Sequence, residues 1–402
     1  MRLPVCLAIL LAVASAADWP QFLGPQRNGS GPALPANALR NPRLLWKKDI
    51  GAGFSAPVVS GGKLVVFHRI QNREVVECWN ASTGAQVWSL EYPTAYRDDF
   101  GFDEGPRGTP AVFGGKVYTF GAEGVLHAID LATGQKIWRV DTHPKFAVQK
   151  AFFGAAASPL ADTRAVYVNV GGTNGAGLVA FDMRNGETLW TSTNHEAGYS
   201  SPIFATFGGV QSILCFTREG LVALDPASGK VRFEFPWRSR SNASVNAAVP
   251  VVIGDFIFLS ASYNTGSVLL KVTGNQLSTV WSSDDALSSH YASLVQKDGF
   301  VFGFHGRQEF GQSLRCIELK TGKVRWSMDR YGAGTVTLLG DQLLVVRENG
   351  EAVLAPAAPD AFRPGVKAQL LPPVVRSYPA IAESRIFARN EKTMVAYALA
   401  PQ

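Results

Sequence analysis

The stretch that decides the fold is "AIDLATGQKIW", residues 128–138, in which an acidic residue, a glycine and a tryptophan stand four positions apart. The carboxylate of Asp130 can accept hydrogen bonds from backbone N–H groups two residues on, which begins a turn. Gly134 can then adopt a positive φ angle without steric cost. Apolar alternation before the turn and Trp138 after it predict a β-hairpin whose aromatic ring packs on a neighbouring unit.

This spacing is repeated along the chain. The other copies are Asn80, Gly84 and Trp88; Asp182, Gly186 and Trp190; Asp225, Gly229 and Phe233; and Glu318, Gly322 and Trp326. An internal repeat of this kind indicates a ring or an array of similar units. We interpret the tryptophans that share one position in the unit as structural residues that pack between blades. They are Trp46, Trp88, Trp138, Trp190, Trp281 and Trp326.

A second signal opens each unit: a proline or small residue, an apolar pair, a short turn and a strongly β-forming strand. The anchors are Pro57, Pro110, Pro159, Pro202, Pro250, Ser293, Val336 and Pro379, with steps of 43 to 53 residues between them. Blades of four strands repeat every 40 to 50 residues or so in propellers. The sequence therefore predicts an all-β, eight-bladed β-propeller with four-stranded blades.

The last unit is incomplete, because no turn-plus-tryptophan strand follows residue 379 before the chain ends at Gln402. The segment "RLLWKKDI", residues 43–50, precedes the first unit and is typical of an outer strand. We predict that it pairs with the last three strands and closes the ring, because closure removes exposed sheet edges. Seven blades with loose ends is the alternative, since the seventh unit lacks the turn motif. In the eight-bladed prediction, the propeller domain covers residues 43–402 and follows an extended segment at residues 17–42.

The first sixteen residues have the pattern of a secretory signal peptide: Arg2, an apolar run and the small residues "ASA" before a cleavage site at Ala16. We therefore expect an exported protein, periplasmic or extracellular. The rest of the chain has no apolar run of about 18 residues, so no transmembrane segment is expected after cleavage. We also expect a monomer.

Charge and cysteine content exclude two classes of protein. The net charge of +6 is spread along the chain, which argues against nucleic-acid binding. Cys78, Cys215 and Cys316 fall in blades that are not neighbours, so pairing is geometrically improbable and no disulfide framework is expected.

The repeat "G-x-L-x-A-x-D-x-x-T-G-x-x-x-W" resembles the pyrroloquinoline-quinone (PQQ) type propeller repeat, and "DWPQFLGPQRNG" (residues 18–29) resembles a group of exported bacterial PQQ-like propellers. The family includes quinoprotein alcohol dehydrogenases and the non-enzymatic propeller subunit of the outer-membrane β-barrel assembly machinery. The resemblance implies the fold, whereas a fold does not determine an activity. PQQ with calcium is disfavoured as a cofactor, because the chain lacks the family's adjacent cysteine pair and the long insertion that covers the quinone.

The segments just before each innermost strand should lie over one mouth of the channel, so we take their polar residues as candidates for binding a ligand or a partner. They are Asp99, Asp103, Glu104, Arg107, His195, Tyr199, Arg238, Arg240, Asn246, His290, Tyr291, Arg330, Arg376 and Tyr378. Arginine and tyrosine are enriched where proteins meet. The histidines have no near-spaced partner for zinc, and we predict no metal site and no catalytic residues.

These observations favour an exported scaffold that binds a partner through the channel mouth and is not an enzyme. The expected partner is a cell-envelope protein or a small polar ligand. The alternative is a PQQ-dependent or other small-molecule oxidoreductase that acts on alcohols or sugars. A deep pocket with converging carboxylates would favour the enzyme, and a shallow surface rich in aromatic residues would favour the scaffold.

Overall fold

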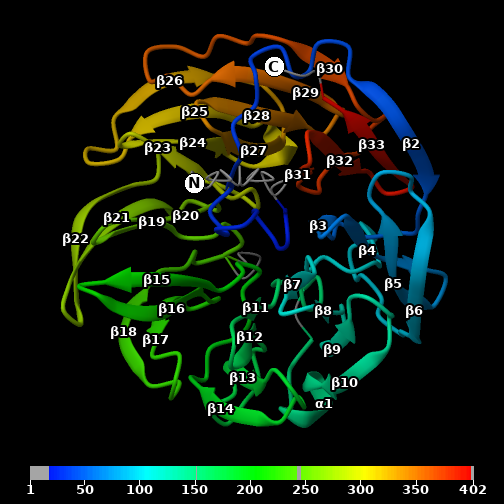
Figure 1. Cartoon of the computed structure of the whole chain (residues 1–402). Helices are drawn as coiled ribbons and strands as arrows, with labels where there is room; N and C mark the ends of the chain where they lie inside the picture. The colour runs from blue at the N-terminus through cyan, green and yellow to red at the C-terminus, as the bar shows by residue number, and fades with distance from the viewer. Residues whose placement is uncertain (1–17, 151, 242–245, 400–402) are drawn as a thin grey trace, which may run out of the picture.

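The computed structural model describes residues 18–150, 152–241 and 246–399, which form a ring of eight β-sheets around a central axis (Figure 1). The helical elements in these ranges are α1 (Thr142–Lys145) and η1 (Gln308–Phe310). Within the same ranges, no helix has the length and hydrophobicity needed to span a bilayer. The signal peptide predicted at residues 1–16 lies outside the described part of the chain.

The first four blades follow one another in chain order, and each is an antiparallel sheet of four strands. Blade 1 comprises β3 (Val58–Ser60), β4 (Lys63–Ile70), β5 (Arg73–Asn80) and β6 (Gln86–Pro93). Blade 2 comprises β7 (Ala111–Phe113), β8 (Lys116–Phe120), β9 (Val125–Asp130) and β10 (Lys136–Asp141). Blade 3 comprises β11 (Leu160–Ala161), β12 (Ala165–Asn169), β13 (Leu178–Asp182) and β14 (Thr188–Ser192). Blade 4 comprises β15 (Ile203–Phe207), β16 (Val210–Phe216), β17 (Gly220–Leu224) and β18 (Val231–Pro236).

The second half of the ring repeats this pattern with two additions from the N-terminal part of the chain. Blade 5 comprises β19 (Val251–Ile253), β20 (Phe256–Ala261), β21 (Gly266–Thr273) and β22 (Gln276–Ser283). Blade 6 comprises β23 (Val295–Lys297), β24 (Phe300–His305), β25 (Ser313–Glu318) and β26 (Val324–Met328). Blade 7 comprises β27 (Gly334–Leu339), β28 (Gln342–Arg347), β29 (Glu351–Pro356) and β30 (Lys367–Gln369), with β1 (Ser30–Gly31) as a fifth strand. Blade 8 comprises β31 (Ala380–Ala382), β32 (Arg385–Arg389), β33 (Thr393–Ala398) and β2 (Arg43–Asp49).

The predicted closure of the ring is confirmed. β2 pairs antiparallel with β33, from Arg43 opposite Ala398 to Asp49 opposite Thr393. The alternative of seven blades is wrong, because the seventh unit completes its sheet with the short strand β30 despite lacking the turn motif. Without β2, the outer edge of β33 would be exposed. Pairing the two ends of the chain covers that edge, completes blade 8 and closes the ring.

The turn motif works through three contacts, which the hairpin around Gly134 illustrates. The Asp130 carboxylate accepts hydrogen bonds from the N–H groups of Ala132 and Thr133, at 3.0 and 2.8 Å. Gly134 has a φ of +76°, and a Cβ there would lie 2.6 Å from the indole ring of Trp88 in the preceding blade. Glycine is therefore required twice over, for its backbone conformation and for the close approach of the ring.

The repeated tryptophans join neighbouring blades at six of the eight seams. In each case the indole N–H donates a hydrogen bond to a backbone carbonyl of the following blade. The pairs are Trp46 and Ala81, Trp88 and Leu131, Trp138 and Met183, Trp190 and Pro226, Trp281 and Leu319, and Trp326 and Ala358. Phe233 occupies the tryptophan position in blade 4 and has no N–H group to donate, so the seam between blades 4 and 5 lacks this bond.

Hydroxyl groups join the blades a second time, close to the axis. The N–H groups of Thr109 and Ser158 donate to the side-chain oxygens of Ser158 and Ser201 in the next blade, at 2.9 and 2.8 Å. The N–H of Ser293 donates to the Tyr378 hydroxyl at 2.7 Å. These bonds satisfy backbone groups that would otherwise be buried without partners at the start of each innermost strand.

The N-terminal segment, residues 18–31, crosses the inner strands of several blades (Figure 1, dark blue). The backbone of Trp19 exchanges two hydrogen bonds with Val59 of blade 1, and the carbonyl of Pro20 accepts from Val112 of blade 2. The guanidinium of Arg27 is 3% exposed and donates to the carbonyl of Pro159 in blade 3. β1 then adds in parallel to β27. The segment therefore fills the axis of the ring on the face opposite the blade-linking loops.

Burial of His127 predicts acid lability. The residue is 1% exposed, and its ring centroid lies 4.5 Å from that of Tyr92, with the ring planes tilted by 50°. Burial first, and Arg139 next, lower the pKa of His127 from 6.5 to about 4. The unfolded chain therefore binds more protons than the folded chain between pH 6.5 and 4, so the stabilising effect is complete above pH 6.5 and is lost as the pH falls. The free energy of unfolding of the wild type should fall between pH 7 and pH 4. We expect His127→Phe to reduce that fall by about 2–3 kcal/mol.

Urea unfolding at both pH values, followed by circular dichroism, measures this effect. His143→Phe is the control, because His143 is less deeply buried and its pKa is lowered to a lesser degree. Equal pH slopes for the wild type and His127→Phe would contradict the assignment to His127.

Candidate functional site

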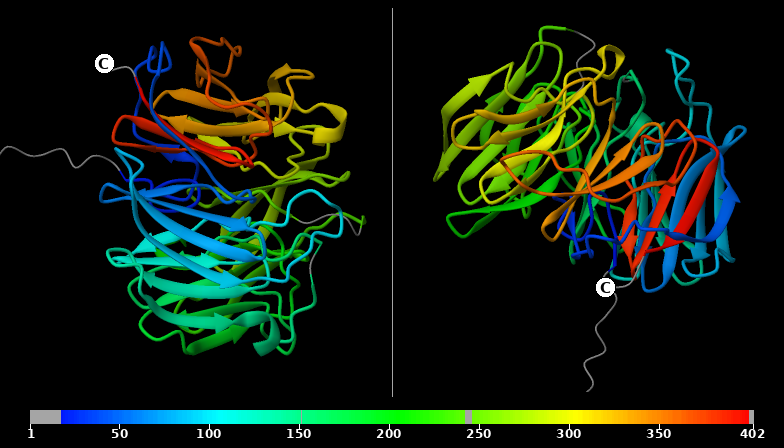
Figure 2. Two further views of the ribbon diagram at one scale, coloured as in Figure 1. Left: turned by 90° about the vertical axis from the view of Figure 1, so that its right-hand side faces the viewer. Right: turned by 90° about the horizontal axis from the view of Figure 1, so that it is seen from above.

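The residues predicted at the channel mouth belong to loops that connect the outermost strand of one blade to the innermost strand of the next. Figure 2 shows one of these loops, residues 94–110, projecting in cyan beyond the strands on one face of the ring. The hairpin turns between the first and second strands of each blade lie on the other face, because the strands run antiparallel. The mouth is therefore the face on which the blade-linking loops gather.

Arg107 contacts two aromatic rings at the mouth. Its guanidinium carbon is 5.7 Å from the centroid of the Phe54 ring and 5.2 Å from that of Phe153. Its N–H groups donate to the carbonyl oxygens of Phe153 and Asp103. The guanidinium of Arg376 approaches the same Phe54 ring at 5.5 Å. Two cations from different blades therefore share one aromatic ring, which cation–π attraction favours.

The contacts continue from Arg376 toward blade 6. Its Nε donates to Oε1 of Glu348 at 2.8 Å, and the hydroxyl of Tyr291 donates to the same oxygen at 2.8 Å. The ring of His290 lies 5.7 Å from that of Tyr291. Its Nε2 is 3.1 Å from the hydroxyl of Tyr263. Side chains that are far apart in the chain are thus joined across the blade-linking loops.

In the other direction the contacts reach blade 4. The backbone N–H of Phe153 donates to the hydroxyl of Tyr199 at 2.6 Å, and the two rings lie 5.8 Å apart. The neighbouring ring of Phe152 lies 5.2 Å from the guanidinium of Arg218. We call the connected set the mouth belt. It comprises Phe54, Arg107, Phe153, Tyr199, Tyr291, Glu348 and Arg376, each of which is partly exposed.

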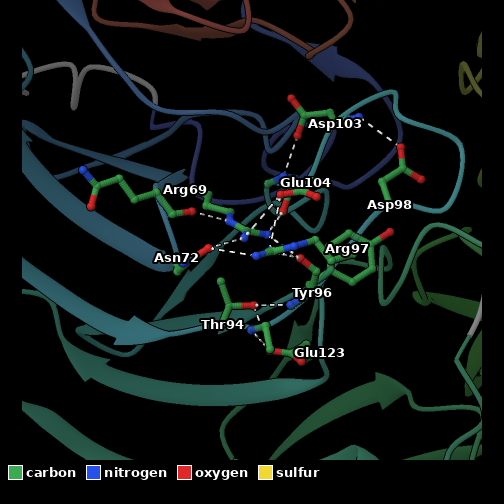
Figure 3. A network of polar contacts seen from close by, with 12 residues as sticks. Arg69, Asn72, Thr94, Tyr96, Arg97, Asp98, Asp103, Glu104 and Glu123 are labelled. Carbon is green, nitrogen blue, oxygen red and sulfur yellow. Dashed lines mark hydrogen bonds and ion pairs between the residues drawn. The ribbon is translucent and has the colours of Figure 1, made fainter.

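The acidic loop beside Arg107 is held together by its own carboxylates (Figure 3). The carboxylate of Asp98 is fully buried and accepts hydrogen bonds from the N–H groups of Phe102 and Asp103. Asp103 in turn accepts from the N–H of Gly53 at 3.0 Å. Glu104 lies 3.4 Å from Arg69. Within the described residues, no group of three or more metal-ligating side chains comes together.

Four further candidates are not members of the mouth belt, although the carbonyl of Asn246 accepts a hydrogen bond from the backbone N–H of Tyr199 at 3.1 Å. Asp99 pairs with Lys150 at the surface, and His195 bonds to the hydroxyl of Thr217. Asn246 is 3% exposed and its amide donates to the carbonyl of Thr217. Tyr378 is also buried, and its ring meets Phe22 of the N-terminal segment edge-on.

Three arginines complete the set of candidates. Arg238, Arg240 and Arg330 are exposed. Their side chains take no part in the contacts that join the mouth belt.

The pKa shifts at the mouth keep two tyrosines and one histidine uncharged. Burial, and then the charge of Glu348, raise the pKa of Tyr291 well above its usual value. Burial likewise raises the pKa of Tyr199. Burial lowers the pKa of His290. At neutral pH the mouth therefore presents protonated hydroxyls of the mouth belt, and the uncharged imidazole of His290 beside it, together with the two guanidinium groups, which suits hydrogen bonding and stacking.

The mouth does not fit PQQ with calcium. A planar tricarboxylate needs a flat slot and free cations, but Arg376 is bonded to Glu348 and Arg107 to backbone carbonyls. The axis beneath holds residues 18–31, with Phe22 packed against Tyr378. Calcium requires six to eight oxygen ligands. Among the described residues, no three or more His, Cys, Asp or Glu side chains come together that could supply the carboxylate part of such a set.

Three residues of the mouth belt are absent from the sequence-based candidates: Phe54, Phe153 and Glu348. Phe54 stands three positions before the anchor Pro57, and Phe153 six before Pro159, so the rule that selects the blade-linking loops could have included both. Glu348 lies in the turn between β28 and β29, which also faces the mouth because the strands alternate in direction. Only its contacts with Tyr291 and Arg376 distinguish it from other turn residues.

Comparisons with known proteins agree with this architecture. A family model described as outer membrane protein assembly factor BamB matches residues 72–328. The outer membrane protein assembly factor BamB of Burkholderia pseudomallei is 27% identical over 285 residues, which is 66% of this chain and 67% of that protein. The solved structure of BamB from Moraxella catarrhalis superimposes with a TM-score of 0.63 at 15% identity, covering 89% of this chain and 99% of that one.

A second group of relatives matches a smaller part of the chain. The dehydrogenase subunit of the quinone alcohol dehydrogenase of Gluconacetobacter polyoxogenes is 31% identical over 160 residues, which is 37% of this chain. That match spans only 21% of the dehydrogenase subunit. The match to the BamB model covers more than half of the 402 residues, and this chain belongs to the BamB family of PQQ-like β-propellers.

Proposed function

We propose that this protein is a non-catalytic scaffold of the bacterial cell envelope that binds another envelope protein through its mouth belt. The family assignment supports the class of function, since its members are described as outer membrane protein assembly factors. The signal-peptide pattern of residues 1–16 supports export. The observation that carries the proposal is the mouth belt itself, a connected surface of two arginines and four aromatic rings.

The composition of the mouth belt is that of a protein interface. Tyrosine and arginine are enriched among the residues that contribute most to binding between proteins. The aromatic rings of Phe54, Phe153, Tyr199 and Tyr291 are partly exposed, and hydrogen bonds or ring contacts hold each in place. Side chains that are ordered before binding lose less entropy when a partner arrives. The residues of the N-terminal segment fill the axis below, which leaves a surface suited to a protein rather than a channel suited to a small molecule.

The test is capture of partners from a cell-envelope extract by the purified protein, with and without changes in the mouth belt. We expect the double variant Arg107→Ala/Arg376→Ala to reduce recovery of a cross-linked partner at least tenfold, because truncating a central arginine at an interface costs about 2 kcal/mol or more. The control is Arg164→Ala/Arg184→Ala, two exposed arginines on the turns of blade 3 that face away from the mouth.

Two outcomes would overturn the proposal. One is equal recovery of partners by the wild type and the mouth-belt variant. The other is saturable binding of PQQ with calcium accompanied by dye-linked oxidation of an alcohol, which would make the protein an enzyme. Thermal unfolding of both double variants checks that any loss of capture does not come from loss of the fold.

A further inference from the structure

A groove opens between blades 4 and 5, on the face opposite the mouth. It has a volume of about 770 Å³ and is bounded by two turns of each blade. On the side of blade 4 its walls include Phe207 and Phe233, and on the side of blade 5 they include Val272. Pockets that bind ligands commonly have volumes of about 300–1,000 Å³, so the volume of this groove is in the range of a binding site.

The groove lies at the seam where the tryptophan bond between blades is missing. Val272 occupies the position in blade 5 that Leu319 occupies in blade 6, because each donates its N–H to a carbonyl of the first turn of its own blade, Asp255 and Gly299 respectively. Leu319 accepts the indole N–H of Trp281. At the equivalent place before Val272 stands Phe233, which is smaller than tryptophan and carries no donor.

The turn on the blade 5 side is also shortened. At five of the other seams a short turn presents a glycine against the indole ring of the preceding blade, as Gly322 does against Trp281. Blade 5 instead turns through Gly274 and Asn275, and a Cβ added at Gly274 would meet no atom within 4 Å. A smaller ring on one side and a shorter turn on the other together leave the space open.

The seam between blades 7 and 8 also lacks the tryptophan, but there a different side chain bridges the blades. The hydroxyl of Tyr397 donates to the carbonyl of Leu370 at 3.0 Å. Leu370 and Leu371 are both buried in the apolar cluster of this region. The groove between blades 4 and 5 is therefore not a general consequence of losing the tryptophan.

The rim of the groove carries an excess of positive charge. Arg232 is paired with Asp225 at 2.6 Å. Lys230 and Lys271 are exposed and, within the described residues, form no ion pair, while Asp255 is the remaining carboxylate of the lining. Two ammonium groups against one free carboxylate favour an occupant with acidic groups at this rim.

We propose that the groove is a second binding site, which takes a short protein segment carrying a tryptophan flanked by acidic residues. The six tryptophans at the other seams show which side chain this architecture accommodates between blades: an indole ring whose N–H meets the carbonyl at the position of Val272. The two lysines supply the charge that pairs with the acidic flanks. The site is independent of the mouth belt and would bind on the opposite face of the ring.

The test uses the peptide Glu-Glu-Trp-Glu-Glu-amide with fluorescein attached to its N-terminal amine, and fluorescence anisotropy with the full-length protein. We expect saturable binding that weakens at least tenfold in Phe233→Trp, because the new indole fills the space that the peptide would take. Lys230→Glu/Lys271→Glu should also weaken binding at least tenfold. A peptide with alanine in place of tryptophan should bind at least tenfold more weakly to the wild type.

The matched control is Lys323→Glu, which changes the equivalent charge at a seam that already holds its tryptophan. We expect it to leave peptide binding unchanged. Absence of saturable binding by the wild type, or equal affinity in the wild type and Phe233→Trp, would overturn the proposal. Circular dichroism of Phe233→Trp confirms folding, and the double lysine variant, altered only at exposed positions, gives a second measurement that does not depend on repacking.

Discussion

Replacing Trp46 by alanine is expected to lower the free energy of unfolding by about 3–5 kcal/mol, because a large buried aromatic side chain is lost at the point where the ring closes. Trp46 is 9% exposed, donates its indole N–H to Ala81 at 3.0 Å, and lies 6.1 Å from the ring of Phe387. It therefore joins strand β2 to both blade 8 and blade 1.

Urea unfolding followed by circular dichroism measures this loss. Leu44→Ala is the matched control, because Leu44 lies on the same strand but is 46% exposed. Its expected effect is about 0.5 kcal/mol or less, as for most surface substitutions. If Trp46→Ala were no more destabilising than Leu44→Ala, closure by β2 would not be a principal source of stability.

The second large effect is expected from Gly134→Ala, at about 2–4 kcal/mol of lost stability. Part of the loss comes from placing a side chain at a φ of +76°, which costs about 1 kcal/mol. The rest comes from overlap with the Trp88 ring, since a Cβ at this position would lie 2.6 Å from it. Overpacking of this kind usually costs about 1–3 kcal/mol.

Gly274→Ala separates these two contributions. Gly274 also has a positive φ, of +61°, but a Cβ there would meet no atom within 4 Å. We expect this variant to lose only the backbone part, about 1 kcal/mol. Equal losses in Gly134→Ala and Gly274→Ala, measured by urea unfolding, would show that the contact between glycine and tryptophan adds nothing to the turn geometry.

The two proposed binding sites lie on opposite faces and depend on different residues, so they can be tested independently. Changes at Arg107 and Arg376 address the mouth, and changes at Phe233 address the groove. A protein with both sites occupied would hold one partner over the blade-linking loops and another against the turns. Such a protein could bring two envelope proteins together, which is consistent with a scaffold.

Much of the architecture is predictable from local pattern. The acidic turn residue, the glycine and the tryptophan recur because each blade makes the same contacts with its neighbour, so one copy explains the others. The closing strand at residues 43–50 is predictable because the last unit lacks one strand and the start of the chain supplies one. The loops that gather at the mouth follow from the same strand order.

The contacts within the mouth are less predictable. Loop position along the chain selects Arg107, Tyr199, Tyr291 and Arg376, and these four do belong to one connected surface. The same rule selects Asn246 and Tyr378, yet both are buried. The amide of Asn246 donates to the carbonyl of Thr217 in the neighbouring blade, and the hydroxyl of Tyr378 accepts from the N–H of Ser293 two blades away. Loop position does not distinguish an exposed side chain from a buried one, because the distinction depends on the neighbouring blade.

The sequence by itself thus determined the ring, its eight blades and its closure, because these depend on short-range turn chemistry repeated at a regular period. Only the tertiary structure decided that residues 18–31 fill the axis, that Phe54 meets Arg107 and Arg376, and that a groove opens beside Phe233. The physical reason is that each of these features arises from contacts between residues of different blades. Such contacts depend on how close two residues lie in space, and a repeat pattern along the chain does not predict that distance.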